Sequence, residues 1–181
     1  MSVARYPLRG LVACAGISGG GLSIDYPIDK ARQILEVNLL GTFACCQAAG
    51  QAFQKHGLPS SVVLVASMSG HGSNKGVDTT AYNASKAAVV QLASSLAAEW
   101  GSRVGIPCVR VNSLSPGYIK TRMTERSLAD PACEVAWSAD NMLNRLSYAE
   151  EYRGAVVYLL SDASSFVTGS DLRADGGHTA W

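Results

Sequence analysis

The sequence predicts an α/β fold built on a parallel sheet, and three observations lead to this prediction. Short apolar runs of strand character alternate with longer stretches of helical periodicity along the 181 residues. The run 61–67 (SVVLVAS) is apolar nearly throughout, as expected of a parallel strand covered on both faces. No repeat, linker or low-complexity segment interrupts the alternation, so we expect a single domain over residues 1–181.

Each expected element has a local signal. Apolar residues spaced by three or four predict a helix from Ile28 to about Phe53, which Gly57 and Pro59 end. The Ala- and Leu-rich stretch Tyr82–Trp100 predicts a second helix. A third is expected over 149–162, where acidic residues at the start complement the helix dipole. Strands are expected at 11–15, 61–67, 108–117 and, shorter, at 171–177, and the segment 118–147 is polar and irregular with scattered helical signals.

Composition excludes several classes of function. The net charge is +1 and the Lys and Arg residues are scattered, so neither nucleic acid nor an anionic membrane is an expected partner. No apolar run approaches the ~20 residues of a membrane helix. The five cysteines include no CxxC pair and the histidines lack ligand spacing, which argues against a disulfide framework and against a metal site. Four thiols in apolar surroundings, expected to be buried, favour a reducing, cytoplasmic compartment: Cys14, Cys45, Cys46 and Cys108.

The glycines that follow the first apolar run are candidates for a phosphate-binding loop. Gly16, Gly19, Gly20 and Gly21 do not match the spacing G-x-G-x-x-G of a dinucleotide-binding loop, and six residues separate Gly21 from Ile28, the first expected helical position. No Gly-Lys-Ser/Thr sequence is present either. We therefore interpret these glycines as permissive loop residues after a strand.

The candidate chemistry lies further along the chain. Tyr82 and Lys86 are four residues apart on a predicted helix, so they share one face, and an ammonium near a phenol favours the phenolate and supports proton transfer. Ser67 ends a predicted central strand, where α/β enzymes place catalytic groups, and Ser69 competes for the same role. Asn38 lies within a helical pattern where Asn has low propensity, which suggests that it holds a water or a backbone carbonyl.

These residues lie in stretches that together resemble a classical short-chain dehydrogenase/reductase. The stretches occur in family order over essentially the whole chain, and the mannitol, sorbose and carbonyl reductase branch is the most similar. They read ACAGIS, VNLLGTF, VASMSG, AYNASKAAV, VRVNSLSPGYIKT and LLSDASSFVTGSDLRADGG.

The resemblance implies a role for each matching residue. Tyr82 corresponds to the proton donor or acceptor, and Lys86 to the residue that lowers the pKa of that tyrosine and holds the nicotinamide ribose. Ser67, which we prefer to Ser69, corresponds to the serine that positions the carbonyl. Asn38 corresponds to the residue that anchors a water of the proton relay. The implied contacts with the cofactor are Ala15, Gly16, Asn38, Tyr82, Lys86, Ile119 and Thr121.

The resemblance also implies a Rossmann-like, doubly wound parallel sheet that is truncated at its N-terminus. The family places a glycine-rich βαβ region before the stretch that corresponds to ACAG, and only about ten residues precede it here. Cys14 stands where the family usually has Asn. Three interpretations remain open: a reductase in a shortened sequence, a non-catalytic partner of a full-length subunit, and a member of the related epimerase/dehydratase branch.

The implied activity is hydride transfer between a nicotinamide cofactor and a carbonyl or secondary alcohol, in polyol or secondary metabolism. NADP(H) is expected rather than NAD(H), from the resembling branch, together with a homo-oligomer formed through the helix Tyr82–Trp100. Apolar residues between 122 and 147 are expected either to wall the substrate pocket or to lie in the core, and His71 to face the substrate. These apolar residues are Met123, Leu128, Trp137 and Met142.

Overall fold

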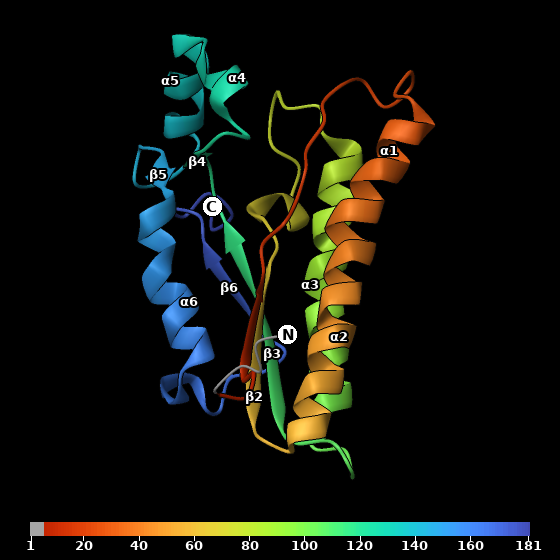
Figure 1. Cartoon of the computed structure of the whole chain (residues 1–181). Coiled ribbons are helices and arrows are strands. Elements are labelled where there is room, and N and C mark those ends of the chain that lie inside the picture. The colour runs from red at the N-terminus through yellow and green to blue at the C-terminus, as the bar shows by residue number, and fades with distance from the viewer. Residues whose placement is uncertain (1–5) are drawn as a thin grey trace.

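A four-stranded parallel sheet lies at the centre of the computed structural model, which describes residues 6–181 (Figure 1). The sheet order is β1-β2-β3-β6, and all three pairings are parallel. Parallel neighbours require crossover connections, and helices supply them here. The strands are β1 (Gly10–Ala13), β2 (Ser60–Val65), β3 (Val109–Pro116) and β6 (Asp171–Ala174).

Helices cover both faces of this sheet, which confirms the predicted doubly wound α/β architecture (Figure 1). One face carries α1 (Ile28–Leu35), α2 (Thr42–His56) and α3 (Thr80–Trp100), and the other carries α6 (Arg153–Leu160). The carboxyl ends of the strands point toward α4 (Glu125–Leu128) and α5 (Pro131–Ala139). Ligands of open α/β sheets bind outside that edge.

Alternation along the strands divides the core between the two faces. Val62 and Leu64 on β2 pack with α2 and α3, whereas Val63, between them, packs with Leu114 and Leu159 on the α6 side. All five side chains are at most 1% exposed. Because successive strand residues point to opposite faces, a continuous apolar run is what a strand buried on both sides requires. This accounts for the composition of 61–67.

The helix expected over 28–53 contains a local change of winding. A π-helical segment, Glu36–Gly41, lies between α1 and α2 and carries Asn38. Gly57 ends α2 with a φ of 66°, a left-handed conformation that glycine adopts without strain. The π segment inserts an extra residue into the helical turn, and such insertions are frequent at functional sites. Periodicity alone did not reveal it.

The segment 118–147 is more regular than the sequence suggested. Besides α4 and α5 it contains a two-stranded parallel pairing of β4 (Ile119–Lys120) with β5 (Ser147–Tyr148). The helix expected over 149–162 begins with a 3-10 turn, Ala149–Tyr152, before α6. These elements are too short for their periodicity to be read from sequence.

Strand β1 lies at the edge of the sheet. Its register with β2 runs from Gly10↔Ser61 to Ala13↔Leu64, and no residue among 6–181 pairs with its other edge. Its four residues are half-buried, whereas most of β2 and β3 is buried. An unpaired edge of this kind presents free backbone donors and acceptors.

The thiols are more exposed than the sequence predicted. Cys14, Cys45 and Cys108 are exposed and only Cys46 is buried, so the expectation of four buried thiols was wrong for three of them. Cys14 follows an edge strand and Cys108 precedes β3, while Cys45 is turned about 100° around α2 from Cys46. An apolar neighbourhood in the sequence does not determine which side of an element a residue occupies.

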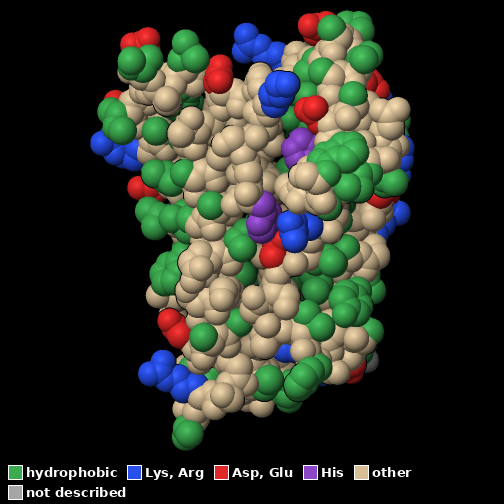
Figure 2. All heavy atoms as spheres, turned by 180° about the vertical axis from the view of Figure 1, so that it is seen from behind, with side chains coloured by type: hydrophobic (Ala, Val, Ile, Leu, Met, Phe, Trp, Pro, Cys, Tyr) green, Lys and Arg blue, Asp and Glu red, His purple; other side chains and the backbone are tan. Residues whose placement is uncertain are grey.

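The surface shows no segregation of charge on the face seen in Figure 2, where acidic, basic and hydrophobic side chains are interspersed. Across residues 6–181, no helix combines the length and apolar character needed to cross a bilayer.

Candidate active site

A cavity of about 810 Å³ opens at the carboxyl ends of β2 and β3. Its walls come from the loop after β1, the turn after β2, the start of α3, and the segment from β4 to α5. These elements are far apart in the sequence and meet at the end of the sheet that α4 and α5 cover (Figure 1). Six of the predicted site residues line the cavity: Gly16, Ser67, Tyr82, Lys86, Ile119 and Thr121.

Lys86 and Tyr82 share one face of α3, as their spacing predicts. The ammonium of Lys86 donates to the carbonyl of Val65 at 2.8 Å and lies 5.8 Å from the centroid of the Tyr82 ring. Lys86 is 4% exposed, and burial lowers its pKa to about 8 because it disfavours the charged form. This lysine is therefore held at the end of β2, beside the phenol.

Burial raises the pKa of Tyr82, and a hydrogen bond with the Ser67 side chain partly offsets that rise. The lowering of the pKa that was expected from Lys86 is not seen in the protein alone, because desolvation of the phenol is the larger effect. At neutral pH Tyr82 is a protonated phenol that is close to a serine hydroxyl.

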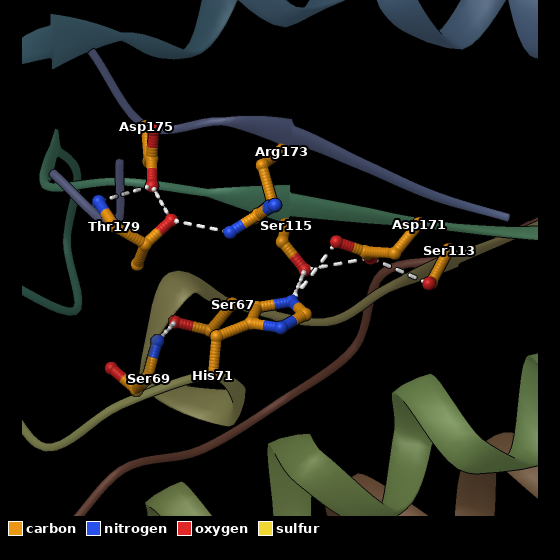
Figure 3. A network of polar contacts seen from close by, with 9 residues as sticks. All are labelled: Ser67, Ser69, His71, Ser113, Ser115, Asp171, Arg173, Asp175 and Thr179. Carbon is orange, nitrogen blue, oxygen red and sulfur yellow. Dashed lines mark hydrogen bonds and ion pairs between the residues drawn. The ribbon is translucent and has the colours of Figure 1, made fainter. Parts of the chain in front are cut away.

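The two candidate serines have different partners. The Ser67 hydroxyl accepts the backbone N–H of Ser69 at 3.2 Å and caps the 3-10 turn Met68–Gly70 (Figure 3). The Ser69 hydroxyl accepts a hydrogen bond from the amide of Asn74 at 2.7 Å. Both serines are buried and both line the cavity, but it is Ser67 that interacts with Tyr82.

Asn38 lies behind the cavity wall and has no exposed surface. Its side chain donates to the carbonyl of Ile17 at 2.9 Å and accepts from the N–H of the same residue at 2.8 Å. It also donates to the Ser85 hydroxyl at 2.9 Å, and that hydroxyl donates to the carbonyl of Tyr82 at 2.7 Å. Asn38 therefore connects the loop after β1 to the turn of α3 that carries the tyrosine.

The loop after β1 lies very close to these groups at Gly16. A Cβ at this position would lie 3.3 Å from Asn38 Oδ1 and 3.4 Å from Lys86 Nζ, so glycine keeps this part of the cavity open. Ala15, a predicted cofactor contact, is exposed and is not part of the cavity wall. Cys14 does line the cavity.

The side of the cavity opposite α3 is aromatic. Tyr118 and Trp137 stack with their ring centroids 4.2 Å apart and their planes 5° apart, and both line the cavity together with Met123. Leu128 and Met142 do not line it. His71, expected to face the substrate, instead turns toward β3 and β6 and lies outside the cavity wall (Figure 3).

Sequence reasoning missed three contributors to this site: Ser85, Asn74 and Tyr118. Ser85 accepts a hydrogen bond from Asn38, 47 positions earlier in the chain, and Asn74 donates one to Ser69 within the same loop, and no periodicity or motif marks either residue. Tyr118 follows Pro-Gly in the stretch that was recognised as a cofactor-side segment, and that position was the available signal. Among residues 6–181, no group of three or more His, Cys, Asp or Glu is placed to hold a metal ion.

The comparisons with known proteins agree with this geometry. A family model described as enoyl-(acyl carrier protein) reductase matches residues 5–179. A protein named short chain dehydrogenases/reductase notP', from Aspergillus versicolor, is 56% identical over 177 residues. This chain belongs to the short-chain dehydrogenase/reductase family. The matched region covers 98% of this chain and 61% of the length of that relative.

Two further similar proteins are named after sugar and polyol reactions. An NADP-dependent mannitol dehydrogenase from Hypocrea jecorina is 40% identical over 168 residues, covering 93% of this chain and 60% of that protein. An NADH-dependent L-xylulose reductase from Ambrosiozyma monospora is 40% identical over 180 residues, covering 98% of this chain and 64% of that protein.

A solved structure of a short-chain type dehydrogenase/reductase from Mycobacterium marinum superposes with a TM-score of 0.90 at 38% identity. The superposed region covers 97% of this chain and 66% of the chain in that structure. The chain thus spans between 60% and 66% of the length of the four proteins named here, and over that span its fold is that of the family.

Proposed function

We propose that this chain carries the proton-transfer side of an oxidoreductase that interconverts a carbonyl compound and a secondary alcohol. The observation that supports this most is the convergence of Tyr82, Ser67 and Lys86 on one cavity from two separate elements. The phenol of Tyr82, the hydroxyl of Ser67 and the ammonium of Lys86, whose pKa is lowered, are together suited to general acid–base catalysis on a substrate oxygen.

Each residue has a defined part in the proposed mechanism. Ser67, held by the N–H of Ser69, hydrogen-bonds the substrate oxygen and orients it toward Tyr82. Tyr82 gives its proton to the oxygen during reduction and takes it back during oxidation. Lys86, anchored on Val65, stabilises the phenolate that forms, because its positive charge lies beside the ring. Asn38 keeps the loop and α3 in register while the proton moves.

The residues present fit the nicotinamide and ribose end of a dinucleotide. Gly16 leaves room next to Lys86 where a larger residue would fill the space, and Ile119 and Thr121 face the same cavity. A nicotinamide cofactor bound there supplies the hydride. We propose NADP(H) in preference to NAD(H), supported by the names of two mannitol dehydrogenases, although a xylulose reductase of similar identity is named for NADH. A polyol or ketose is the proposed substrate class, on the same basis.

A second copy of the chain is the proposed partner, bound through α3. The outer face of α3 carries small exposed side chains, which permit close approach of another helix: Ala84, Ala87, Ser94, Ser95 and Ala98. Ala87→Arg should therefore reduce the molar mass measured by light scattering to that of one chain. An unchanged mass would mean that α3 is not the interface.

The alternative function is that of a non-catalytic partner subunit. The edge of β1 that no strand among residues 6–181 pairs with favours it, because its backbone donors and acceptors are open to pairing with another chain. Cofactor binding by the purified chain, followed by nicotinamide fluorescence, separates the two proposals. Weak or absent binding supports the partner role.

Tyr82→Phe tests the catalytic proposal. The substitution removes the hydroxyl and keeps the ring, so turnover should fall at least a hundredfold while cofactor affinity stays the same. Tyr158→Phe is the matched control, because Tyr158 lies on α6, on the opposite face of the sheet. Turnover retained in Tyr82→Phe would remove Tyr82 from the mechanism.

A further inference from the structure

His71 forms a polar network with strands β3 and β6, away from the cavity (Figure 3). Its Nε2 lies 3.1 Å from the hydroxyl of Ser115 and 2.9 Å from Oδ2 of Asp171. The other carboxylate oxygen, Oδ1, accepts the hydroxyls of Ser113 at 2.5 Å and Ser115 at 2.8 Å. Asp171 is thus a largely buried carboxylate whose Oδ1 accepts two hydroxyls, while its Oδ2 lies beside the imidazole and has no hydrogen-bond partner.

The three residue types Ser, His and Asp occur together here, but they do not form a hydrolytic triad. A triad uses one ring nitrogen for the serine and the other for the carboxylate. In this network Ser115 and Asp171 both approach Nε2 of His71, so no proton can pass from one through the ring to the other. The network is therefore suited to holding a segment in place.

The segment it holds is the turn that carries Ser67. The carbonyl of Ser67 accepts the N–H of Gly70, and the carbonyl of Met68 accepts the N–H of His71, both at 2.9 Å. His71 therefore ends the short turn that Ser67 begins. Only three residues separate the two positions, and two backbone hydrogen bonds and one side-chain cap join them, so a displacement of His71 is transmitted to Ser67.

Helix α3 restrains the same turn from the opposite side. A Cβ on Gly70 would lie 2.9 Å from the carbonyl carbon of Lys86 and 3.0 Å from the backbone nitrogen of Ala87. The turn is in backbone contact with the helix that presents Tyr82 and Lys86. His71 and Asp171 fix its other side to the sheet. Without that attachment the turn has freedom to move away from α3.

We propose that His71 and Asp171 are positioning residues that attach the Ser67 turn to β3 and β6 and thereby hold the Ser67 hydroxyl against Tyr82. The inference rests on the proposed function for the roles of Ser67 and Tyr82, and it adds residues that touch neither substrate nor cofactor. Other charged groups on these elements are separately engaged. Arg173 of β6 donates to Thr179, and Asp175 accepts from Gly177 and Thr179 (Figure 3).

The ionisation of Tyr82 gives a readout that does not require turnover. Ser67 lowers the pKa of this phenol, so loss of its hydrogen bond in His71→Ala should raise the titration midpoint of Tyr82. The midpoint is followed by NMR of protein labelled at tyrosine Cζ, with Tyr82→Phe to assign the signal. The charged side chains on the cavity wall are Lys86, Asp78 and Arg126, and the substitution leaves them in place.

Asp171→Asn is the second variant, because it keeps the shape and removes the carboxylate that attracts the ring. It should shift the midpoint in the same direction. Ser61→Ala is the matched control: it deletes a buried hydrogen bond to Leu159 at the opposite end of β2, at 2.8 Å, and should lower the melting temperature without moving the Tyr82 midpoint.

With an active enzyme, both variants should lower kcat about tenfold and leave the KM for cofactor unchanged. A Tyr82 midpoint that stays the same in His71→Ala and Asp171→Asn, with stability lost as in Ser61→Ala, would overturn the proposal. The proposed function fails by a different result, namely full turnover in Tyr82→Phe. The two failures are therefore distinguishable.

Discussion

Replacing Asn38 by alanine should destabilise the fold by about 3 kcal/mol. The side chain makes three hydrogen bonds, to the N–H and carbonyl of Ile17 and to the hydroxyl of Ser85, at 2.8 to 2.9 Å. Each such bond contributes about 1 kcal/mol net, and removing one partner leaves the others without a replacement where water cannot enter. Asn38 has no exposed surface, so water does not substitute for its amide.

Chemical denaturation with urea, followed by circular dichroism, measures the loss of unfolding free energy. For a chain of this size a loss of about 3 kcal/mol corresponds to a fall in melting temperature of roughly 6 to 12 °C. Ser85→Ala removes one of these three bonds together with the bond from the Ser85 hydroxyl to the carbonyl of Tyr82, and should cost about 2 kcal/mol. Gln47→Ala, at an exposed position of α2, should change the free energy by less than about 0.5 kcal/mol.

A loss below about 1 kcal/mol in Asn38→Ala would refute this reasoning. It would mean that the loop after β1 does not depend on the amide, and that the π-helical segment positions Asn38 for some purpose other than these bonds.

Three further predictions concern the surroundings of the site. Gly70→Ala should cost about 1 to 3 kcal/mol in urea denaturation, since its Cβ would lie 2.9 Å from backbone of α3, whereas Gly72→Ala, with open space around it, should be neutral. Lys86 has a pKa of about 8 in the folded protein, below its value in the unfolded chain, so the folded state loses this proton at a lower pH. The free energy of unfolding should therefore rise from pH 8 toward pH 10, relative to that of Lys86→Met. A difference between the two proteins that does not change with pH would contradict this. Burial raises the pKa of Cys46 to about 11, so an alkylating reagent added to native protein should modify the exposed Cys45 and spare Cys46. Mass spectrometry of the peptides measures the labelling of each thiol. Equal labelling of both would contradict the packing of α2.

The order of strands and helices was predictable from the sequence because it depends on local periodicity. The apolar run of β2 and the spacing of Tyr82 and Lys86 on one helix are properties of neighbouring residues, and the structure has them as expected. Recognition of Ser67, Tyr82, Lys86 and Asn38 as candidates came from residue type and spacing together with the family resemblance. Their catalytic roles remain predictions.

The tertiary structure decided which atoms meet. His71 was expected in the cavity, and its direction depends on Asp171, which lies a hundred positions later in the chain. The choice between Ser67 and Ser69 similarly depends on Asn74 and Tyr82, and the raised pKa of Tyr82 depends on how much protein surrounds the phenol. Periodicity and motifs describe positions along the chain, whereas hydrogen bonds and desolvation depend on distances between segments that only folding brings together.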